Sequence, residues 1–362
     1  MTAGCGGSRP RSEPTVGAGF ARGLLDLAVA RGAERRALLA LSGLTAAELA
    51  DQDARVPLAG YVALMRAGKA LSGDPALGLH FGEAVDIAEV SIVGLLGQAS
   101  ATMLDAFRQL NRYVLLVVEA EKADAGDRFR FASRHGGLWM VDTRRNPNAF
   151  PELTESAFAQ LVCGPRRFGE GPKLKAIHVT HPDPGYRGEY ERIFGCPVTF
   201  DADWNAMQFD ASWGDAPVAR LPRYVFGVLS ERAEALLMAL ESSKTVRGRV
   251  EALLMPVLHT GEASVEAIAA QLGLSRQTLY RGLKAEGVTF AGVLDALRHE
   301  LALHYLSGKK ASVNETAYLV GFSDPAAFSR AFKRWTGSSP GAMRAAKAIA
   351  KGTAKGMDRR AA

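Results

Sequence analysis

One stretch decides how this 362-residue chain is organised: Ser312-Val-Asn-Glu-Thr-Ala-Tyr-Leu-Val-Gly-Phe-Ser-Asp-Pro-Ala-Ala-Phe-Ser-Arg-Ala-Phe-Lys333. Its first part predicts a short amphipathic helix, because residues suited to a buried stripe recur at i, i+3, i+4 and i+7: Val313, Thr316, Ala317 and Val320. Ser312 and Glu315 form the Ser-x-x-Glu pattern of a capping box at the start of this helix. Gly321 ends it.

A second helix is predicted directly after this turn. Asp324 suits its N-cap, and Pro325 suits the first helical position. Phe328 and Phe332 are four residues apart and predict its inner face. The outer face carries small, polar and basic residues: Ala326, Ser329, Arg330 and Lys333. Two helices joined in this way predict a helix-turn-helix unit, whose second helix enters the major groove of DNA.

The same pattern occurs 48 residues earlier in the chain. Ser264 precedes a helical stripe formed by Val265, Ile268, Ala269 and Leu272. Gly273 ends that helix, and Ser275 caps a second one, which runs to about Glu286. Leu279 and Leu283 point inward, and the opposite face carries Arg276, Gln277, Tyr280, Arg281 and Lys284. A repeat of a whole supersecondary unit arises by chance far more rarely than either copy alone.

A longer helix is predicted between the two copies, from about Thr289 to Leu306, because apolar residues recur there every three to four positions. Such a helix is about 25 Å long at about 1.5 Å per residue. It could hold two recognition helices about one DNA turn apart, near 34 Å, so that both reach successive major grooves. One polypeptide would then do what a dimer of helix-turn-helix proteins usually does.

Positive charge is concentrated in the same part of the chain. Residues from Ser243 to Ala362 carry a net charge of +9, whereas the remainder carries −3. This asymmetry is expected when one domain faces a polyanion, although a solvated basic surface without a partner remains an alternative on charge alone. The sequence contains no apolar run of about 18 residues and no secretory signal. The three scattered cysteines fit a reducing compartment, so we expect a cytoplasmic, nucleoid-associated protein without membrane contact.

The stretches Ser264–Ser275 and Leu319–Pro340 closely resemble the AraC/XylS family of bacterial transcription regulators. The resemblance covers about a hundred residues and matches the family signature nearly throughout the second stretch. It implies that one group of side chains lies near bases or the adjacent backbone: Gln277, Tyr280, Arg281, Ala326, Ser329 and Arg330. It implies that another group lies near phosphates: Ser275, Lys284, Ser323 and Lys333. Arg281, Arg330 and Gln277 are the best candidates for direct readout, because Arg pairs with guanine and Gln with adenine.

Two features of these segments allow other interpretations. Gly282 departs from the family pattern, in which a longer side chain is common. Glycine inside a helix costs about 1 kcal/mol relative to alanine, so the first recognition helix is expected to be less rigid than the second. Arg281 and Arg330 could instead brace their units through internal salt bridges. The aromatic residues are expected to form the small core rather than a binding surface: Phe322, Phe328, Phe332 and Trp335.

The first two hundred residues predict an α+β domain. The pattern is mostly helical from Phe20 to Val118, and a helix is also expected over Glu152–Val162. Strand-like alternation occurs in three later segments: Arg128–Phe131, Leu138–Val141 and Leu174–Val179. The stretch Gly94–Tyr113 resembles the ligand-binding domain of one branch of the same family, and the likeness extends loosely to about Asp210. The resemblance implies an effector pocket but names no ligand.

Enzymatic sites are poorly supported by the sequence. His178, His181 and Asp183 could ligate a metal, but no fourth ligand lies close in sequence. The glycines of Gly17–Gly23 follow no predicted strand, which favours a flexible tail over a phosphate loop. Three isolated cysteines cannot form a four-cysteine zinc site, and Cys163 follows a predicted helix rather than a nucleophile elbow. We therefore predict no catalytic residue, cofactor or metal.

These observations predict five segments. A disordered tail over 1–19 precedes an α+β effector domain over 20–215. A connecting helix over 216–243 leads to an all-α DNA-binding domain of two helix-turn-helix units over 244–345, and a basic tail over 346–362 follows. The apolar stripe of the connecting helix could transmit a signal, form a dimer or pack onto the first domain: Val225, Val228, Leu229, Ala233, Leu236 and Leu237.

The predicted function is sequence-specific transcription regulation, with effector-responsive activation as the output that the resemblance favours. The expected partners are double-stranded promoter DNA, a small-molecule effector of unknown identity and RNA polymerase, and a homodimer is left open. Three alternatives remain at this point: a repressor, an architectural DNA-binding protein, and an enzyme-like N-terminal domain targeted to DNA. No residue of the sequence identifies the effector or the target promoter.

Overall fold

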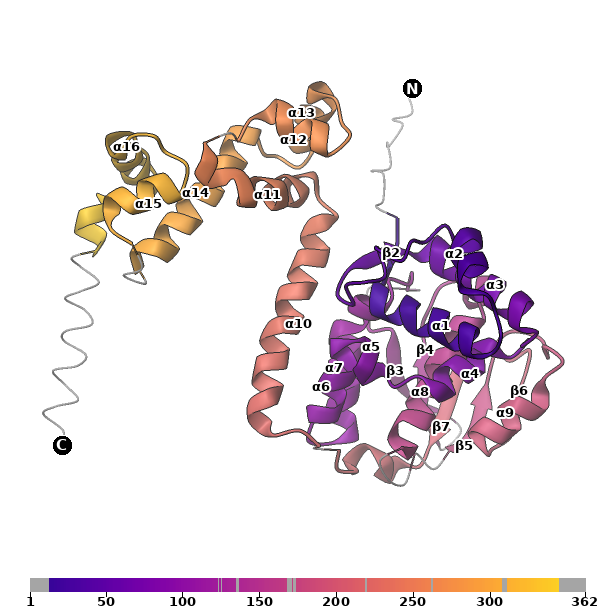
Figure 1. Cartoon of the computed structure of the whole chain (residues 1–362). Coiled ribbons are helices and arrows are strands. Elements are labelled where there is room, and N and C mark those ends of the chain that lie inside the picture. Colours follow the sequence, from indigo (N-terminus) through magenta and orange to yellow (C-terminus); the bar gives the residue numbers. More distant parts are fainter. Residues whose placement is uncertain are drawn as a thin grey trace, which may run out of the picture. The chain divides into compact units, whose positions relative to one another are not determined.

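The computed structural model describes residues 13–344, except 123, 125, 135–136, 168–170, 172–173, 219, 262 and 308–310. The chain divides into two units, with the boundary between Met238 and Ala239. The first unit combines helices with a sheet, and the second is helical in its described part (Figure 1). The predicted fold class is therefore confirmed. The tail predicted over 346–362 lies outside the described residues, and none of the described helices is long and apolar enough to cross a membrane.

Helices form the first part of the first unit, as the sequence predicts. They are α1 (Ala18–Ala30), α2 (Arg35–Ser42), α3 (Leu58–Ser72), α4 (Leu77–Ala84), α5 (Ile87–Val90), α6 (Ile92–Ala99) and α7 (Met103–Val117). The last three begin at side-chain caps, because Asp86, Ser91 and Thr102 each accept a hydrogen bond from an amide of the first turn. Their apolar faces surround a core that contains Phe20 and Tyr61.

The predicted N-terminal tail is wrong from Thr15 onward. Residues Thr15–Gly17 form β1, which pairs antiparallel with β2 (Arg55–Pro57), and α1 begins at the next residue. The two glycines permit close packing: a Cβ on Gly17 would lie 2.9 Å from the carbonyl oxygen of Leu116, and a Cβ on Gly19 would lie 2.4 Å from that of Val90. These glycines therefore reflect tight backbone contact rather than flexibility.

The same segment is not a phosphate loop, although a strand does precede its helix. The amide of Ala18 donates to the carbonyl oxygen of Ala54 at 2.8 Å, and that of Gly19 donates to the carbonyl oxygen of Gln52 at 3.1 Å. A phosphate loop needs amides that are free to bind an anion. Here they already bind the chain itself.

A five-stranded sheet forms the second part of the first unit. Its strands are β3 (Phe129–Arg134), β4 (Gly137–Asp142), β5 (Leu174–His178), β6 (Val198–Thr199) and β7 (Asn205–Phe209), in the order β3-β4-β7-β5-β6. Only β5 and β6 pair in parallel. β3, β4 and β5 confirm the three predicted strands, whereas the central strand β7 and helix α9 (Arg187–Phe194) were not predicted.

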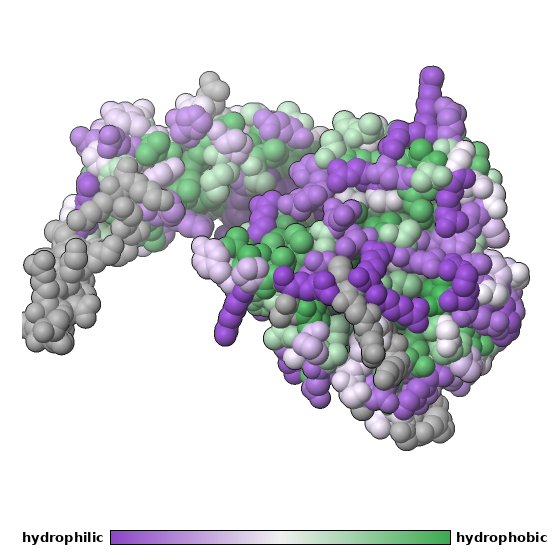
Figure 2. All heavy atoms as spheres, turned by 60° about the horizontal axis from the view of Figure 1, so that its bottom comes forward, coloured by the Kyte–Doolittle hydropathy of each residue, from purple (hydrophilic) through white to green (hydrophobic). Residues whose placement is uncertain are grey.

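Helix α8 (Glu152–Arg166) confirms the predicted helix and links the helices to the sheet. It packs along α4, and its buried Phe158 and Val162 belong to the core that also contains Met207 of β7. Hydrophilic side chains cover much of the face of the first unit in Figure 2, with apolar patches between them. Short 3-10 turns complete the fold at Pro147–Ala149 (η1), Ala211–Asp215 (η2) and, in the second unit, Leu258–Thr260 (η3).

Helix α10 (Arg223–Ser243) spans the boundary between the units. Ala233 is fully buried in the helical core of the first unit, and Phe226, Leu229 and Leu237 pack against that core. Packing onto the first unit, one of the three alternatives for this stripe, is thus present. Val228 lies outside it and is 51% exposed.

The second unit contains both predicted helix-turn-helix pairs. Its helices are α11 (Val246–Val257), α12 (Val265–Gln271), α13 (Arg276–Ala285), α14 (Phe290–Ser307), α15 (Val313–Leu319) and α16 (Pro325–Thr336). The predicted caps are confirmed at Ser264, Ser275 and Asp324, and Ser312 and Glu315 form the complete capping box. Each pair has its own small core.

Helix α14 contributes to both of these cores. Its first half supplies Phe290, Val293 and Leu297 to the core of the first helix-turn-helix, and its second half supplies Ala302 and Leu306 to the other. Figure 1 shows α12 and α13 toward one end of this helix and α15 and α16 toward the other. The two helix-turn-helix pairs are therefore built on one continuous helix.

The turn glycines of the two pairs share a conformation but differ in their surroundings. Gly273 has a φ of 65° and Gly321 a φ of 80°, in the left-handed region that favours glycine. A Cβ added at Gly273 would meet nothing within 4 Å, whereas one at Gly321 would lie 2.1 Å from the carbonyl oxygen of Leu258 in η3. Arg298 of α14 also donates to the carbonyl oxygen of Gly321 at 3.1 Å. The second turn is thus a close packing point within the unit.

Candidate functional site

The outer face of α13 is open to solvent. All the residues that the sequence predicts for DNA contact on this helix and at its cap are exposed: Ser275, Arg276, Gln277, Tyr280, Arg281 and Lys284. Leu279 and Leu283 on the opposite face are fully buried. The helix therefore presents hydrogen-bonding and positively charged groups along one side, which suits a groove of DNA.

The outer face of α16 is similar but less polar. Ser323, Ala326, Arg330 and Lys333 are exposed, and Ser329 is half-buried. Asp324 accepts hydrogen bonds from the amides of Ala326 and Ala327, and these bonds hold the pKa of its carboxyl below the ordinary value. A cap that stays ionised keeps the first turn of this helix rigid.

The arginines on these faces differ in their intramolecular contacts. Arg276 lies 2.9 Å from the carboxylate of Glu266 and stacks over the ring of Tyr280, while Arg330 is 3.9 Å from Asp324. Within the described part of the chain, Arg281 forms no ion pair. Exposed pairs contribute only about 0–1 kcal/mol, so neither pair would keep its arginine from a stronger anionic partner.

Gly282 has a structural explanation. A Cβ at this position would lie 3.0 Å from Cγ2 of Val246, at the start of α11. The glycine therefore lets α11 approach the back of the recognition helix α13. The amides of Val246 and Arg247 also donate to the carboxylate of Glu286 just after α13, at 2.7 and 2.9 Å. These contacts limit the loss of rigidity that a helical glycine would otherwise cause.

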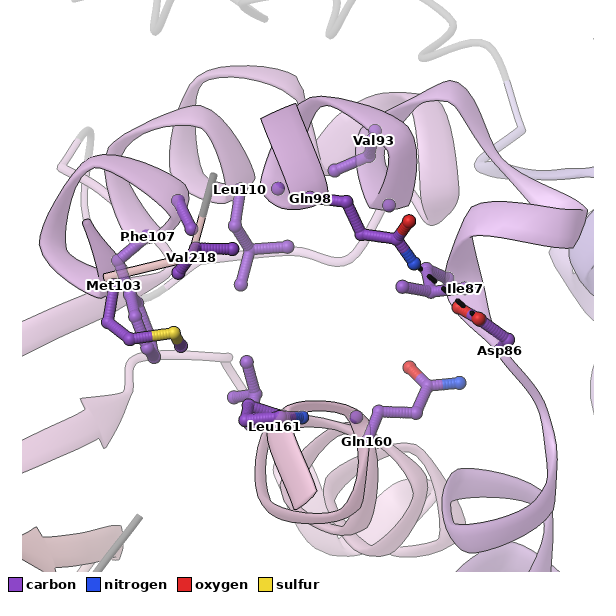
Figure 3. A pocket seen from close by; sticks show the side chains of 15 residues that line it. Asp86, Ile87, Val93, Gln98, Met103, Phe107, Leu110, Gln160, Leu161 and Val218 are labelled. Carbon is purple, nitrogen blue, oxygen red and sulfur yellow. Dashed lines mark hydrogen bonds between the residues drawn. The ribbon is translucent and has the colours of Figure 1, made fainter. Parts of the chain in front are cut away.

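A cavity opens in the first unit between α6, α7 and α8 (Figure 3). Its empty volume is about 740 Å³, part of it open to solvent, which is within the size range of small-molecule sites. Gly97, Met103, Phe107 and Leu110 of the wall belong to Gly94–Tyr113, the stretch for which the resemblance implies an effector pocket. Sequence reasoning missed the other walls, because no local pattern marks them. They come from Asp86 and Ile87, Val93, α8 and Val218.

A buried charge cluster lies beside the sheet. Asp142 of β4 is fully buried between Arg128 and Arg144, with a distance of 3.0 Å from its Oδ2 to Nε of Arg144 and 3.4 Å from its Oδ1 to Nε of Arg128. Burial alone would raise the pKa of Asp142, but the two guanidinium charges outweigh it and hold the pKa below its usual range. The sequence gives no sign of this cluster, because Asp142 ends β4 while Arg128 and Arg144 lie just outside the strands, and only the fold brings the three together.

The residues considered as a metal site bind other parts of the protein. Nδ1 of His178 accepts a hydrogen bond from the indole of Trp204 at 3.0 Å. Nε2 of His181 lies 2.9 Å from the hydroxyl of Tyr190, and Asp183 pairs with Arg187. The three side chains therefore have separate structural roles.

Cys163, the other candidate for catalysis, lies within α8. Burial raises the pKa of its thiol, which disfavours the reactive thiolate.

Comparison with known proteins agrees with both halves of this architecture. A family model described as the N-terminal arabinose-binding domain of AraC transcription regulators matches residues 32–218. A helix-turn-helix domain model matches residues 268–346. The chain belongs to the AraC family of transcription regulators. As an AraC-family member it is a DNA-binding transcription regulator, and the helix-turn-helix pairs described above are its DNA-binding part.

Individual relatives are also transcription regulators. The ornithine utilization regulator of Pseudomonas aeruginosa is 28% identical over 336 residues, which cover 89% of this chain and 94% of that protein. The transcriptional activator RhaS of Escherichia coli is 44% identical over 80 residues, 22% of this chain and 29% of that protein. The crystal structure of the regulator CdpR from Pseudomonas aeruginosa is 21% identical, covers 90% of this chain and 98% of its own, and has a TM-score of 0.39.

Proposed function

We propose that this AraC-family regulator is an effector-responsive activator that binds promoter DNA through α13 and α16. The observation that supports the proposal is the exposure of Arg281 and Arg330 at corresponding places on the two recognition helices. We expect Gln277, Arg281 and Arg330 to read bases, with Tyr280, Ala326 and Ser329 beside them. Arg276 lies on the same face. We expect Ser275, Lys284, Ser323 and Lys333 to contact phosphates.

Replacing either base-reading arginine should weaken specific binding selectively. Arg281→Ala and Arg330→Ala should each cost about 1–3 kcal/mol at a site selected by the full-length protein from random DNA, because each removes a bidentate contact to a base. Binding to unrelated DNA should change little. Electrophoretic mobility shifts at fixed salt measure both affinities.

The matched control for this experiment is Arg36→Ala, which removes an exposed arginine from α2 of the first unit. It should leave both affinities unchanged. Equal losses on selected and unrelated DNA in the Arg281 and Arg330 variants would instead favour an architectural protein that reads only the backbone.

A phosphate contact should have a different signature. Lys284→Ala should weaken binding to all sequences by a similar factor and reduce the slope of log K against log salt concentration by about one unit, because one fewer counterion is released. The measurement is a titration of binding at several salt concentrations. An unchanged slope would remove Lys284 from the set of phosphate contacts.

The effector response is supported by the way the cavity wall continues into α10. Ala216, Val218 and Arg220 lie against the turn from α6 to α7. The amide of Met103 donates to Ala216, that of Val218 to Ala101 and that of Arg220 to the carbonyl oxygen of Gln98, at 2.9–3.1 Å. Gln98 and Val218 both line the cavity. A ligand there touches the segment that leads directly into α10.

Helix α10 has a second connection to the cavity. Glu234 of α10 accepts hydrogen bonds from Arg112 at 2.8 Å and from the hydroxyl of Tyr113 at 3.1 Å, and both donors lie on the cavity-lining helix α7. A ligand that favours one placement of α7 would thus favour one placement of α10. Effector control requires that the ligand bind two arrangements of the protein with different affinity.

Activation as the output is supported by the name of the relative RhaS, and we expect RNA polymerase to be the partner through which the bound protein acts. The protein would act on the nucleoid in the cytoplasm. We expect the effector to be released chemically unaltered. Recovery of a changed product from the protein would support an enzymatic first unit instead.

A further inference from the structure

A second, inner chamber adjoins the proposed effector cavity. The outer chamber is the one drawn in Figure 3. The inner chamber has an empty volume of about 560 Å³, again including space open to solvent, and the two have four wall residues in common: Ile87, Leu110, Gln160 and Leu161. Because they share these walls, the chambers adjoin each other between α7 and α8. A ligand that occupied both would be longer than either chamber.

The outer chamber suits an apolar group. Met103 and Phe107 of α7 face Leu161 of α8 across it, and Val218 closes one end (Figure 3). Its polar side chains gather at the other end, where Asp86 accepts a long hydrogen bond of 3.5 Å from Gln98. Filling such an apolar space with hydrocarbon releases water at little polar cost.

The polar groups of the inner chamber include hydrogen-bond donors that are unused or weakly used. Gln160 directs its side chain from α8 into the cavity drawn in Figure 3 and also lines the inner chamber, and its Nε2 is buried without a hydrogen-bond partner among the described residues. Ser156 donates only weakly, at 3.4 Å, to the carbonyl oxygen of Leu153. No aspartate or glutamate lines this chamber within the described part of the chain. A buried donor without a partner favours a ligand that brings an acceptor oxygen.

The third polar residue of the inner chamber is a cation. Arg128 is buried, and its contacts to Asp142 are long, at 3.4 and 3.5 Å. Asp142 is shared with Arg144, so the three buried side chains carry one net positive charge. A buried charge without a full counter-charge is costly and favours an anion beside it.

We propose that this double chamber binds a monocarboxylic acid with an apolar body. The body lies in the outer chamber among Met103, Phe107 and Leu161, and the carboxylate lies in the inner chamber, where Gln160 donates to it and Arg128 balances its charge. The proposal names the class of effector and rests on the proposed effector response. Among the described wall residues, Asp86 in the outer chamber is the only acidic one, so a cationic amine would find its counter-charge there and would meet Arg128 in the inner chamber.

The test is isothermal titration calorimetry of the full-length protein with four probes: sodium octanoate, 1-octanol, octylamine and L-ornithine. Octanoate should bind with one-to-one stoichiometry. The alcohol should bind at least about tenfold more weakly, because it lacks the charge that Arg128 balances. Binding of 1-octanol as tight as that of octanoate, or binding of octylamine or L-ornithine in preference to it, would overturn the proposal.

Two variants place the ligand within the chambers. Gly97→Leu should abolish octanoate binding by filling the outer chamber, and it should fold because a Cβ at Gly97 meets nothing within 4 Å. Gly188→Leu, on the exposed side of α9 with equally free space, is the matched control and should bind octanoate normally. Gln160→Leu should weaken binding about tenfold, as expected for one hydrogen bond to a charged group. Normal binding by Gly97→Leu would show that the ligand lies elsewhere and would overturn the proposal.

The same titrations separate this inference from the effector response. If octanoate binds as described but leaves the affinity for the selected DNA site unchanged, the ligand class is supported and the effector response is contradicted. If octanoate does not bind, the ligand class is overturned, while the DNA contacts of Arg281 and Arg330 are tested independently.

Discussion

Gly321→Ala should disrupt the second helix-turn-helix far more than the equivalent change disrupts the first. Both turn glycines have positive φ, so alanine at either position costs about 1–2 kcal/mol of backbone strain. At Gly321 the new Cβ would also lie 2.1 Å from the carbonyl oxygen of Leu258, and a backbone atom cannot move aside as a side chain can. Overpacking of this kind adds about 1–3 kcal/mol.

Hydrogen–deuterium exchange of the full-length protein measures this effect locally. Gly321→Ala should lower the protection of α15 and α16 and should also weaken binding to selected DNA, because α16 carries Arg330. Gly273→Ala is the matched control, since its Cβ would meet nothing within 4 Å, and should lower the protection of α12 and α13 only by the strain that both variants share. Equal losses of protection in the two variants would show that contact with η3 does not hold the second turn.

Asp142→Asn should strongly destabilise the first unit. The substitution leaves Arg128 and Arg144 buried without a negative charge between them, and breaking a buried pair in this way costs about 3–5 kcal/mol. Urea unfolding at pH 7, followed by tryptophan fluorescence, to which Trp139 in the same strand contributes, should show a markedly lower midpoint. Asp124→Asn, which removes an exposed partner of Arg130, is the control and should shift the midpoint little.

The effect of Asp142→Asn on the free energy of unfolding should depend on pH. Because the pKa of Asp142 is lower in the folded protein than in the unfolded chain, its ionised form stabilises the fold fully above the unfolded pKa of about 3.9. This stabilisation is lost as the pH falls through the folded pKa. The difference in unfolding free energy between wild type and Asp142→Asn should therefore shrink below about pH 4. A difference that stays constant down to pH 3 would mean that Asp142 is not ionised between its two arginines.

Local signals explain why so much of the second unit could be predicted. Caps act within three residues of sequence, so the serines and Asp324 that begin its helices are recognisable without knowledge of the fold. The apolar stripes of α12 and α15 are equally local. Helix α11 was not predicted separately, and its contact with Gly282 could be seen only once α11 and α13 were placed together.

The first unit depended more on contacts between distant segments. Strand β7 occupies the centre of the sheet with Asn, Ala, Met and Gln, which are not strong strand formers, and burial on both faces removes the alternation that marks a half-exposed strand. The cavity between α6, α7 and α8 draws Asp86, Gln160 and Val218 from three segments. Thr15–Gly19 was assigned to a tail because glycines that permit close packing have the same composition as flexible ones.

The shared helix α14 has a consequence for the promoters that this regulator can serve. One uninterrupted helix belongs to both small cores. The recognition helices α13 and α16 therefore cannot rotate independently of each other to fit a DNA site with altered spacing. A shift of about five base pairs between the two half-targets would turn one of them to the far side of the duplex, because B-DNA repeats about every 10 base pairs. The operators that this regulator binds should therefore tolerate base substitutions far better than changes in the distance between their two half-sites.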